Sequence, residues 1–529
     1  MNIDSDTRAY VIGGGIASLS CAVYLLQEGK LRGEQVTVLY GTHKLGGSLD
    51  AQVLKEKGGY VMRGIRMFEE KSYTCTFDLM SRIPSVDSPE KTLRDEFVEH
   101  NEKNGTYLKS RLVRKGEAVG QRKLSLPFKD RLRLLTLPYK PEVSIEHLAL
   151  NDYFSPDFFS SNFWYEFCTV FAFERWHSLI EFRRYFMRFI HDFPRIDTLE
   201  DVELTPYNQY ESLVGPVVEW LKSKGVIFEE GVQVTDFDFV EDDKGMLEVR
   251  VLHTIRGGEQ GEIQVAEKDF VFTTLGSMTA SSNVGSMHEA PQLKINDKSI
   301  AWTLWNNISK KHSGLGNPEI FNAHVEKSKW ISFTVTLRDD KLIRLLEKYF
   351  DSDVTNFGGV SLISSNWFVS IVTTRMPHFK DQEEGVHFCW GYGLYPDKVG
   401  NYVQKKMSEC TGEEILTEVM YHLGFIDELE AVKEHAVCIP CMTPFVTSQF
   451  LPRGVTDRPQ VVPEFSKNFA FLGQYCEIPK DVVFTVDYSV RSAQTAVYTL
   501  LGLDKKVTPI YKGLHHVSVI FNALITLFR

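Results

Sequence analysis

The sequence contains no run of about 18 to 20 uninterrupted apolar residues, the length that a membrane-spanning helix needs, so we expect no spanning helix. Its first residues, MNIDSDT, are polar and acidic and lack the basic and apolar regions of a secretory signal peptide. These two absences predict a cytoplasmic protein. Peripheral contact with a membrane stays open, because it depends on the C-terminal segment described below.

Clustered cysteines and clustered positive charge are also missing. Eight cysteines are scattered over 529 residues, which is typical of reduced, buried thiols. Cys438-Ile-Pro-Cys441 has CxxC spacing, but no second pair follows at a zinc-site separation, so no metal is expected. The formal net charge of -11, with no basic stripe, argues against a nucleic-acid partner.

The first clear motif is a dinucleotide fingerprint. A short strand over Arg8–Ile12 runs into Gly13-x-Gly15-x-x-Ser18, and a helical pattern and a second strand, Glu34–Tyr40, follow. The first glycine permits a tight turn, the second lets the backbone approach a pyrophosphate, and the small third residue allows close packing. This βαβ unit predicts nucleotide binding; the alternative is a structural unit that has lost its ligand.

Tyr40 favours that alternative, because an acid usually stands there to hold the ribose hydroxyls, and a phenol binds them less strongly. A second glycine turn, Gly46–Asp50, follows soon after, and another strand ends at Gly473 near the C-terminus. A flavin domain assembled from both ends of the chain accounts for this distant piece, whereas a simple nicotinamide dehydrogenase does not need it.

Residues 152–193 are helical in pattern and rich in aromatic side chains. Such a stripe fits a protein core, and it fits the wall of a long apolar tunnel equally well. Composition does not separate the two. The aromatic residues are Phe158, Phe159, Phe163, Trp164, Phe167, Phe171, Phe173 and Trp176.

A series of further motifs resembles the oleate hydratase family, also called the myosin-cross-reactive antigen family. The motifs occur in family order over nearly the whole chain, and many have no general meaning elsewhere. They include the Gly13–Ser18 and Gly46–Asp50 turns, Arg63–Arg66, Phe171–His177, Glu181–Tyr185, Thr205–Tyr210, Gly276–Thr279, Ser332–Thr336, Pro377–Phe379, Trp390–Gly393, Cys410–Ile415, Ser448–Arg453, Asp481–Thr485 and Tyr488–Arg491.

The resemblance implies FAD, a fatty-acid tunnel and addition of water across a cis double bond. It implies a tyrosine that protonates the alkene, which is Tyr185 by position, and a glutamate that activates water. Gln209 and His378 match family residues near the substrate; Gln209 could hold water or a carboxylate, and His378 is given a supporting role. The expected FAD contacts are Gly13, Gly15, Ile16, Ala17, Ser18, Tyr40, Gly47, Ser48, Leu49, Gly276, Ser277, Gly473 and Asp481.

The chain departs from the family pattern around the supposed water site. Met67 stands in place of the glutamate and cannot take a proton, while Ile65 replaces a glycine and stiffens the loop. The family's Thr-x-Asn becomes Val-x-Thr, ending at Thr374. Glu69 or Glu70 could substitute for the glutamate, although both are expected to be solvated surface acids.

The tail from Leu514 to Phe528 has apolar residues at helical spacing, with lysines and histidines upstream. Such a helix either docks on the protein's own core or lies reversibly on a membrane surface. The pattern leaves both open, as it leaves the oligomeric state open between monomer and homodimer.

Together these observations predict an α/β protein with an FAD-binding, Rossmann-like fold of the two-dinucleotide-binding-domain type, a mixed-sheet substrate domain and a helical lid. The expected function is an FAD-dependent hydratase of oleate-like fatty acids. A flavin oxidoreductase of related fold and a catalytically impaired lipid-binding protein are the alternatives. The expected parts are 1–110 with 220–290 and 465–505 for FAD, 111–219 for the lid, 291–464 for substrate and 506–529 for the terminal helix.

Overall fold

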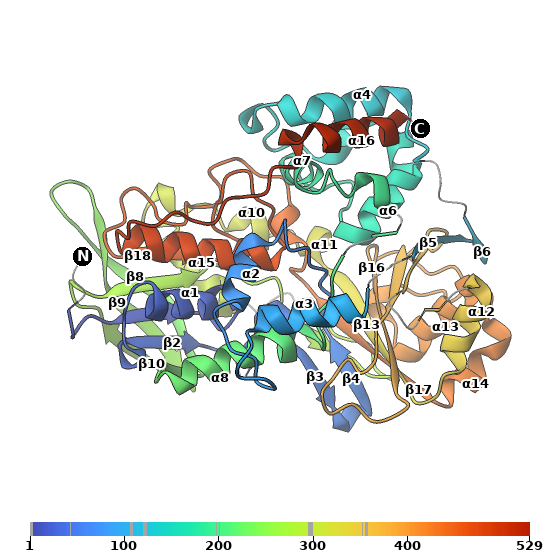
Figure 1. Cartoon of the computed structure of the whole chain (residues 1–529), viewed down its shortest axis with the longest axis horizontal. Coiled ribbons are helices and arrows are strands. Elements are labelled where there is room, and N and C mark those ends of the chain that lie inside the picture. Colours follow the sequence, from blue (N-terminus) through green and yellow to red (C-terminus); the bar gives the residue numbers. More distant parts are fainter. Residues whose placement is uncertain are drawn as a thin grey trace.

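The computed structural model describes residues 4–42, 44–105, 109–119, 124–196, 198–199, 202–294, 300–351, 353–354 and 358–528. Figure 1 shows a parallel-sheet part built around α1, α15 and β2 at one end, and a mixed sheet with α12–α14 at the other. A layer of helices that includes α4, α6, α7 and α16 lies across one side of both. All eight cysteines are free and buried.

A five-stranded parallel sheet forms the core of the first part, in the order β18-β11-β1-β2-β7. β1 is buried at every residue, as expected of a strand covered on both faces. The N-terminal strands β1 and β2 and the C-terminal strand β18 therefore belong to one sheet, as the glycine turns at both ends of the chain predict. The strands are β1 Ala9–Ile12, β2 Val36–Tyr40, β7 Ile227–Glu230, β11 Phe270–Thr274 and β18 Phe469–Leu472.

Helix α1 (Ile16–Gln27) packs against α15 (Val486–Leu500), and both cover this sheet. Two small antiparallel sheets accompany it. One consists of β8 (Val232–Glu241), β9 (Leu247–Arg256) and β10 (Glu259–Gln264), and the other of β3 (Ala51–Leu54) and β4 (Gly59–Met62).

An eight-stranded mixed sheet forms the second part, in the order β12-β17-β13-β16-β15-β14-β5-β6. Its one parallel pairing joins β14 to β5, so residues from the start of the expected lid region belong to this sheet. The strands are β5 Lys109–Arg114, β6 Glu117–Ala118, β12 Asn283–Val284, β13 Trp330–Leu337, β14 Gly358–Leu362, β15 Val369–Thr373, β16 His387–Gly393 and β17 Ala436–Thr443.

Aromatic side chains form the core of the helical layer. Phe158, Phe163 and Phe173 are fully buried and contact neighbouring rings at centroid distances of 4.0 to 6.3 Å, among them Phe163 to Phe167 at 5.6 Å. The helices of this layer are α4 Phe128–Thr136, α5 Leu150–Tyr153, α6 Asn162–Phe171, α7 Leu179–Arg188 and α16 Val517–Phe528.

The remaining helices flank the two sheets. They are α2 Thr74–Met80, α3 Leu93–Lys103, α8 Gly215–Ser223, α9 Ile300–Ile308, α10 Glu319–Asn322, α11 Val325–Ser328, α12 Lys341–Phe350, α13 Gly412–Leu423 and α14 Leu429–Lys433. Among the residues that the structure describes, no helix has the length and apolar character needed to cross a membrane.

Candidate active site

A cleft of about 440 Å³ opens at the carboxyl ends of β1 and β2. Its walls are the turn between β1 and α1, the end of β2, the Gly46–Ser48 turn and the segments that follow β11 and β18. Ligands of open α/β sheets bind outside the carboxyl ends of the strands. The cleft is therefore placed where this fold holds a dinucleotide.

The glycines of the fingerprint have the expected roles. Gly13 has a φ of +121°, and a Cβ atom there would overlap the hydroxyl of Thr274. Gly15 is the N-cap of α1, and no heavy atom lies within 4 Å of where its Cβ would be. The start of α1 therefore borders the open cleft, and the positive end of a helix favours a phosphate group. These residues fit the pyrophosphate of a dinucleotide.

Ten of the thirteen predicted cofactor contacts line this cleft: Gly13, Gly15, Ile16, Ala17, Tyr40, Gly47, Ser48, Gly276, Ser277 and Gly473. The other three lie outside its wall. The hydroxyl of Ser18 donates to the carbonyl of Ile12, and Leu49 is buried. The carboxylate of Asp481 accepts from Arg491 at 2.8 Å, within a buried ion network.

A second, mostly apolar cavity of about 180 Å³ lies between the helical layer and the mixed sheet. Phe167 and Phe171 line it, whereas Phe158, Phe163 and Phe173 do not. The aromatic segment 152–193 therefore contributes some side chains to the protein core and others to the cavity wall, so both of the expected roles apply.

Tyr185 lies on this cavity wall and is only 2% exposed. Its hydroxyl donates to the backbone carbonyl of Val483, and the rings of Phe171 and Phe173 contact it at centroid distances of 5.2 Å. Burial, reinforced by nearby Tyr73, raises the pKa of Tyr185 well above its usual range. The phenol therefore keeps its proton in the folded protein at neutral pH.

The loop from Arg63 to Met67 separates the cleft from the cavity. Arg63 lines the cleft, while Ile65, Arg66 and Met67 line the cavity. The Arg66 guanidinium donates to the carbonyl of Ser48 at 3.3 Å, which ties the loop to the cleft wall, and burial lowers its pKa to about 10. Met67 thus stands beside the apolar cavity with no proton-accepting group.

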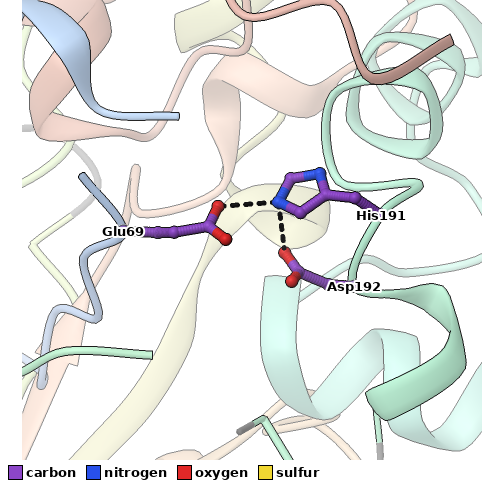
Figure 2. A group of neighbouring side chains, drawn as sticks. All are labelled: Glu69, His191 and Asp192. Carbon is purple, nitrogen blue, oxygen red and sulfur yellow. Dashed lines mark hydrogen bonds and ion pairs between the residues drawn. The ribbon is translucent and has the colours of Figure 1, made fainter. Parts of the chain in front are cut away.

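Glu69 and Asp192 are the carboxylates among the described residues that line this cavity. Figure 2 shows both pointing toward His191. Its Nε2 atom lies 2.7 Å from Glu69 Oε2 and 3.3 Å from Asp192 Oδ2. Arg195 bridges the same two carboxylates, at 3.1 Å and 2.6 Å. The cluster joins the loop of Met67 to the end of the helix that carries Tyr185.

The expectation that Glu69 is a solvated surface acid was wrong, whereas Glu70 is exposed and pairs with Arg94. Burial by itself raises the pKa of Glu69, but His191 and the hydrogen bond from Lys71 outweigh it and lower the pKa to about 2. Burial and the charge of Glu69 raise the pKa of Asp192. Glu69, His191 and Asp192 have the spacing of metal ligands. Ion pairs with Lys71 and Arg195 already neutralise the negative charge of the two carboxylates.

Gln209, Thr374 and His378 meet in a separate small pocket of about 10 Å³, which is room for one water molecule. Ile65 lines this pocket as well as the apolar cavity. The Thr374 hydroxyl is buried with no hydrogen-bond partner in the structure, and burial lowers the pKa of His378 to about 4. The imidazole is therefore neutral at pH 7.

The structure adds functional candidates that sequence reasoning missed. His191, Asp192 and Arg195 join the site only because α7 ends beside the Met67 loop, which no spacing in the sequence reports. Arg375 lines the small pocket and contacts His100 Nε2 at 3.3 Å. Its position directly after Thr374 was a signal that could have been used.

Comparison with known proteins agrees with the sequence motifs. A family model described as the MCRA family matches residues 6–498. An oleate hydratase of Streptococcus pyogenes serotype M49 (strain NZ131) is 36% identical over 97% of this chain and 88% of its own length. A linoleate hydratase of Lactiplantibacillus plantarum is 30% identical over 94% of both chains.

Solved structures support the fold class predicted from the sequence. A triple mutant of putrescine oxidase with redesigned cofactor binding matches with a TM-score of 0.54 and 12% identity, over 94% of this chain and 99% of that one. An oxidoreductase from Methanosarcina mazei matches with a TM-score of 0.51 and 10% identity, over 92% and 100%. The fold is α/β of the Rossmann-like flavoprotein type, and this chain belongs to the MCRA family, the oleate hydratase family that its motifs indicate.

Proposed function

We propose that this protein is a hydro-lyase that adds water across the cis double bond of an oleate-like fatty acid to give a hydroxy fatty acid. The observation that carries the proposal is a buried phenol, Tyr185, on the wall of an apolar cavity beside a dinucleotide cleft. The two hydratase relatives support the same reaction. The cavity's apolar lining suits an alkyl chain, and a bound chain that excludes water would strengthen the charge interactions within it.

FAD is the cofactor we propose for the cleft. The amides at Gly15 and Ile16 would hold its pyrophosphate, and the Gly46–Ser48 turn and Gly473 would pass close to it. When bound, FAD would shape and polarise the neighbouring active site without net redox chemistry. Arg66 couples the two sites, because it lines the cavity and bonds the cleft wall at Ser48.

Tyr185 is proposed as the proton donor. Its O–H bond breaks, the proton forms a C–H bond at one alkene carbon, and positive charge develops on the other carbon. An alkene is a very weak base, so this charge must be stabilised by fixed dipoles and aromatic faces. The Val483 carbonyl holds the hydroxyl before the transfer, and Phe171 and Phe189 line the cavity beside it.

The attacking water is proposed to be held without a carboxylate at position 67. Gln209 and Thr374 offer an amide and an unpartnered hydroxyl in the one-water pocket behind Ile65, and neutral His378 supports them. The water oxygen bonds to the cationic carbon, and the water proton leaves to restore the phenol. One water is added, and nothing is oxidised or reduced.

The protein is also proposed to draw its substrate from a membrane surface. Nine of the sixteen exposed large hydrophobic residues in the described chain lie in 128–143 and 517–528. On α16, Val517 is 82% exposed and Phe521 61%, while Ala523 and Leu527 face inward. The Arg131 guanidinium lies 5.9 Å from the Phe528 ring, and Figure 1 shows α4 beside α16. The surface suits an interfacial helix pair.

Two alternatives make different predictions. A flavin oxidoreductase bleaches its flavin when substrate is added without oxygen, whereas a hydratase shows no net flavin reduction. A catalytically impaired lipid-binding protein binds oleate and releases no product. Incubation with FAD and oleic acid, followed by mass spectrometry, identifies hydration, because only hydration adds the mass of one water to the substrate. Flavin bleaching without oxygen then separates the oxidoreductase from the binding protein.

A further inference from the structure

The nucleotide cleft lacks an acid at the end of β2, where this fold usually places one for the ribose hydroxyls. Tyr40 stands there instead and lines the cleft. A Cβ atom on Gly14 of the glycine turn would lie 3.4 Å from the Cβ of Tyr40, so the phenol stands directly beside that turn. Whatever holds the ribose must act at or through this side chain.

The neighbouring strand provides a carboxylate at the same level. β7 pairs with β2 in parallel, with Glu230 opposite Tyr40, and each is the last residue of its strand. The two residues therefore lie at the same edge of the sheet, Tyr40 in the wall of the cleft and exposed Glu230 beside it on the next strand. The charge of Glu230 raises the pKa of Tyr40, second only to burial, so the two side chains act on each other across the neighbouring strands.

The chemistry of the pair follows from its two groups. A carboxylate only accepts hydrogen bonds, whereas a phenol both donates and accepts them. The phenol oxygen can accept a hydrogen bond from a ligand hydroxyl, and the lone pairs of the carboxylate can accept another. Burial, followed by the charge of Glu230, raises the pKa of Tyr40, so the phenol stays protonated.

We infer that Tyr40 and Glu230 together form the ribose-binding pair of this cleft, with the carboxylate supplied by β7 instead of β2. The ligand group is the vicinal diol of an adenosine ribose, as in FAD or ADP. The inference rests on the proposed cofactor cleft and adds the residues that select its adenosine end. The two hydroxyls of the diol donate to the phenol oxygen and to the carboxylate.

The test is ligand binding, measured by isothermal titration calorimetry on the full chain with FAD, ADP and FMN. Glu230→Gln should weaken FAD and ADP by about 10-fold, as expected for one charge-assisted hydrogen bond at an exposed site. FMN has no adenosine, so its affinity should not change. Glu229→Gln is the matched control, because Glu229 precedes it on β7 and its carboxylate pairs with Arg256 at 3.0 Å.

The double variant tests whether the two side chains act as one unit. Tyr40→Phe should weaken the binding of FAD and ADP. The double variant Tyr40→Phe with Glu230→Gln should lose less affinity than the product of the two single losses. Equal affinity of wild type and Glu230→Gln for both FAD and ADP overturns the inference, as does an equal loss for FMN. If the wild-type protein itself binds neither FAD nor ADP, it is the proposed cofactor cleft that fails.

Discussion

Replacing Tyr185 with phenylalanine removes the proposed acid and keeps its ring. The aromatic contacts with Phe171 and Phe173 remain, so the cavity should keep its shape. What is lost is the proton and the hydrogen bond to the Val483 carbonyl. General acids contribute about 10²- to 10⁴-fold to a rate, which corresponds to about 3 to 5 kcal/mol of barrier. An unpaired buried carbonyl costs about 1 to 3 kcal/mol of stability.

The assay follows the hydroxy fatty acid by mass spectrometry under single turnover, alongside thermal unfolding and oleate binding. Turnover should fall by at least about 100-fold, while oleate affinity changes little. Tyr73→Phe is the matched control, because Tyr73 is a second phenol on the same cavity wall, and most of its turnover should remain. A Tyr185→Phe protein that folds, binds oleate and turns over like the wild type would refute the mechanism.

Four further outcomes are expected. Met67→Glu should raise the hydration rate, because it places a proton acceptor on the cavity wall; a rate that does not rise shows that water is activated elsewhere. Gly15→Val should fold normally, since among the described residues no atom outside its chain neighbours and its own helix backbone lies within 4 Å of the new Cβ. It should nevertheless block FAD titration; unchanged binding means that the cofactor lies elsewhere. Deletion from Leu514 onward should reduce co-sedimentation with liposomes and leave hydration of dispersed oleate largely intact; an insoluble product means that α16 belongs to the core. The free energy of unfolding should fall in acid because of His378, whose folded-state pKa of about 4 lies below the unfolded value of about 6.5. About 3 kcal/mol of stability is lost as the pH falls between these two values, and the His378→Phe variant should lose less over the same range.

Local patterns predicted the nucleotide-binding part well. The strand, glycine turn and helix at Gly13–Ser18 are set by short-range geometry, and β1 and β2 begin and end within two residues of the expected positions. The strand expected to end at Gly473 is β18, which ends one residue earlier. The parallel pairing of β14 with β5 was not predictable, because it joins segments more than 240 residues apart whose local patterns carry no information on their partner.

The candidate site also has a part that the sequence predicted and a part that depends on tertiary contacts. Family motifs named Tyr185, Met67, Gln209, Thr374 and His378 as site residues. The structure places the first two on the cavity wall and the other three on the small pocket. Two features depended on tertiary contacts alone. The sequence pattern around Glu69 is that of an exposed loop acid, but in the structure Glu69 is buried and pairs with His191 and Arg195, which follow α7. Likewise, the carboxylate beside Tyr40 comes from a strand 190 residues later in the chain.

The central claim is that this protein adds the elements of water to an alkene without redox turnover. The most direct measurement is anaerobic incubation of the FAD-loaded protein with oleic acid in heavy-oxygen water, with the flavin spectrum and the product mass recorded together. Hydration without redox turnover predicts a hydroxy fatty acid with the heavy oxygen in its new hydroxyl group and an oxidised flavin spectrum throughout. A bleached flavin with no labelled product would contradict it.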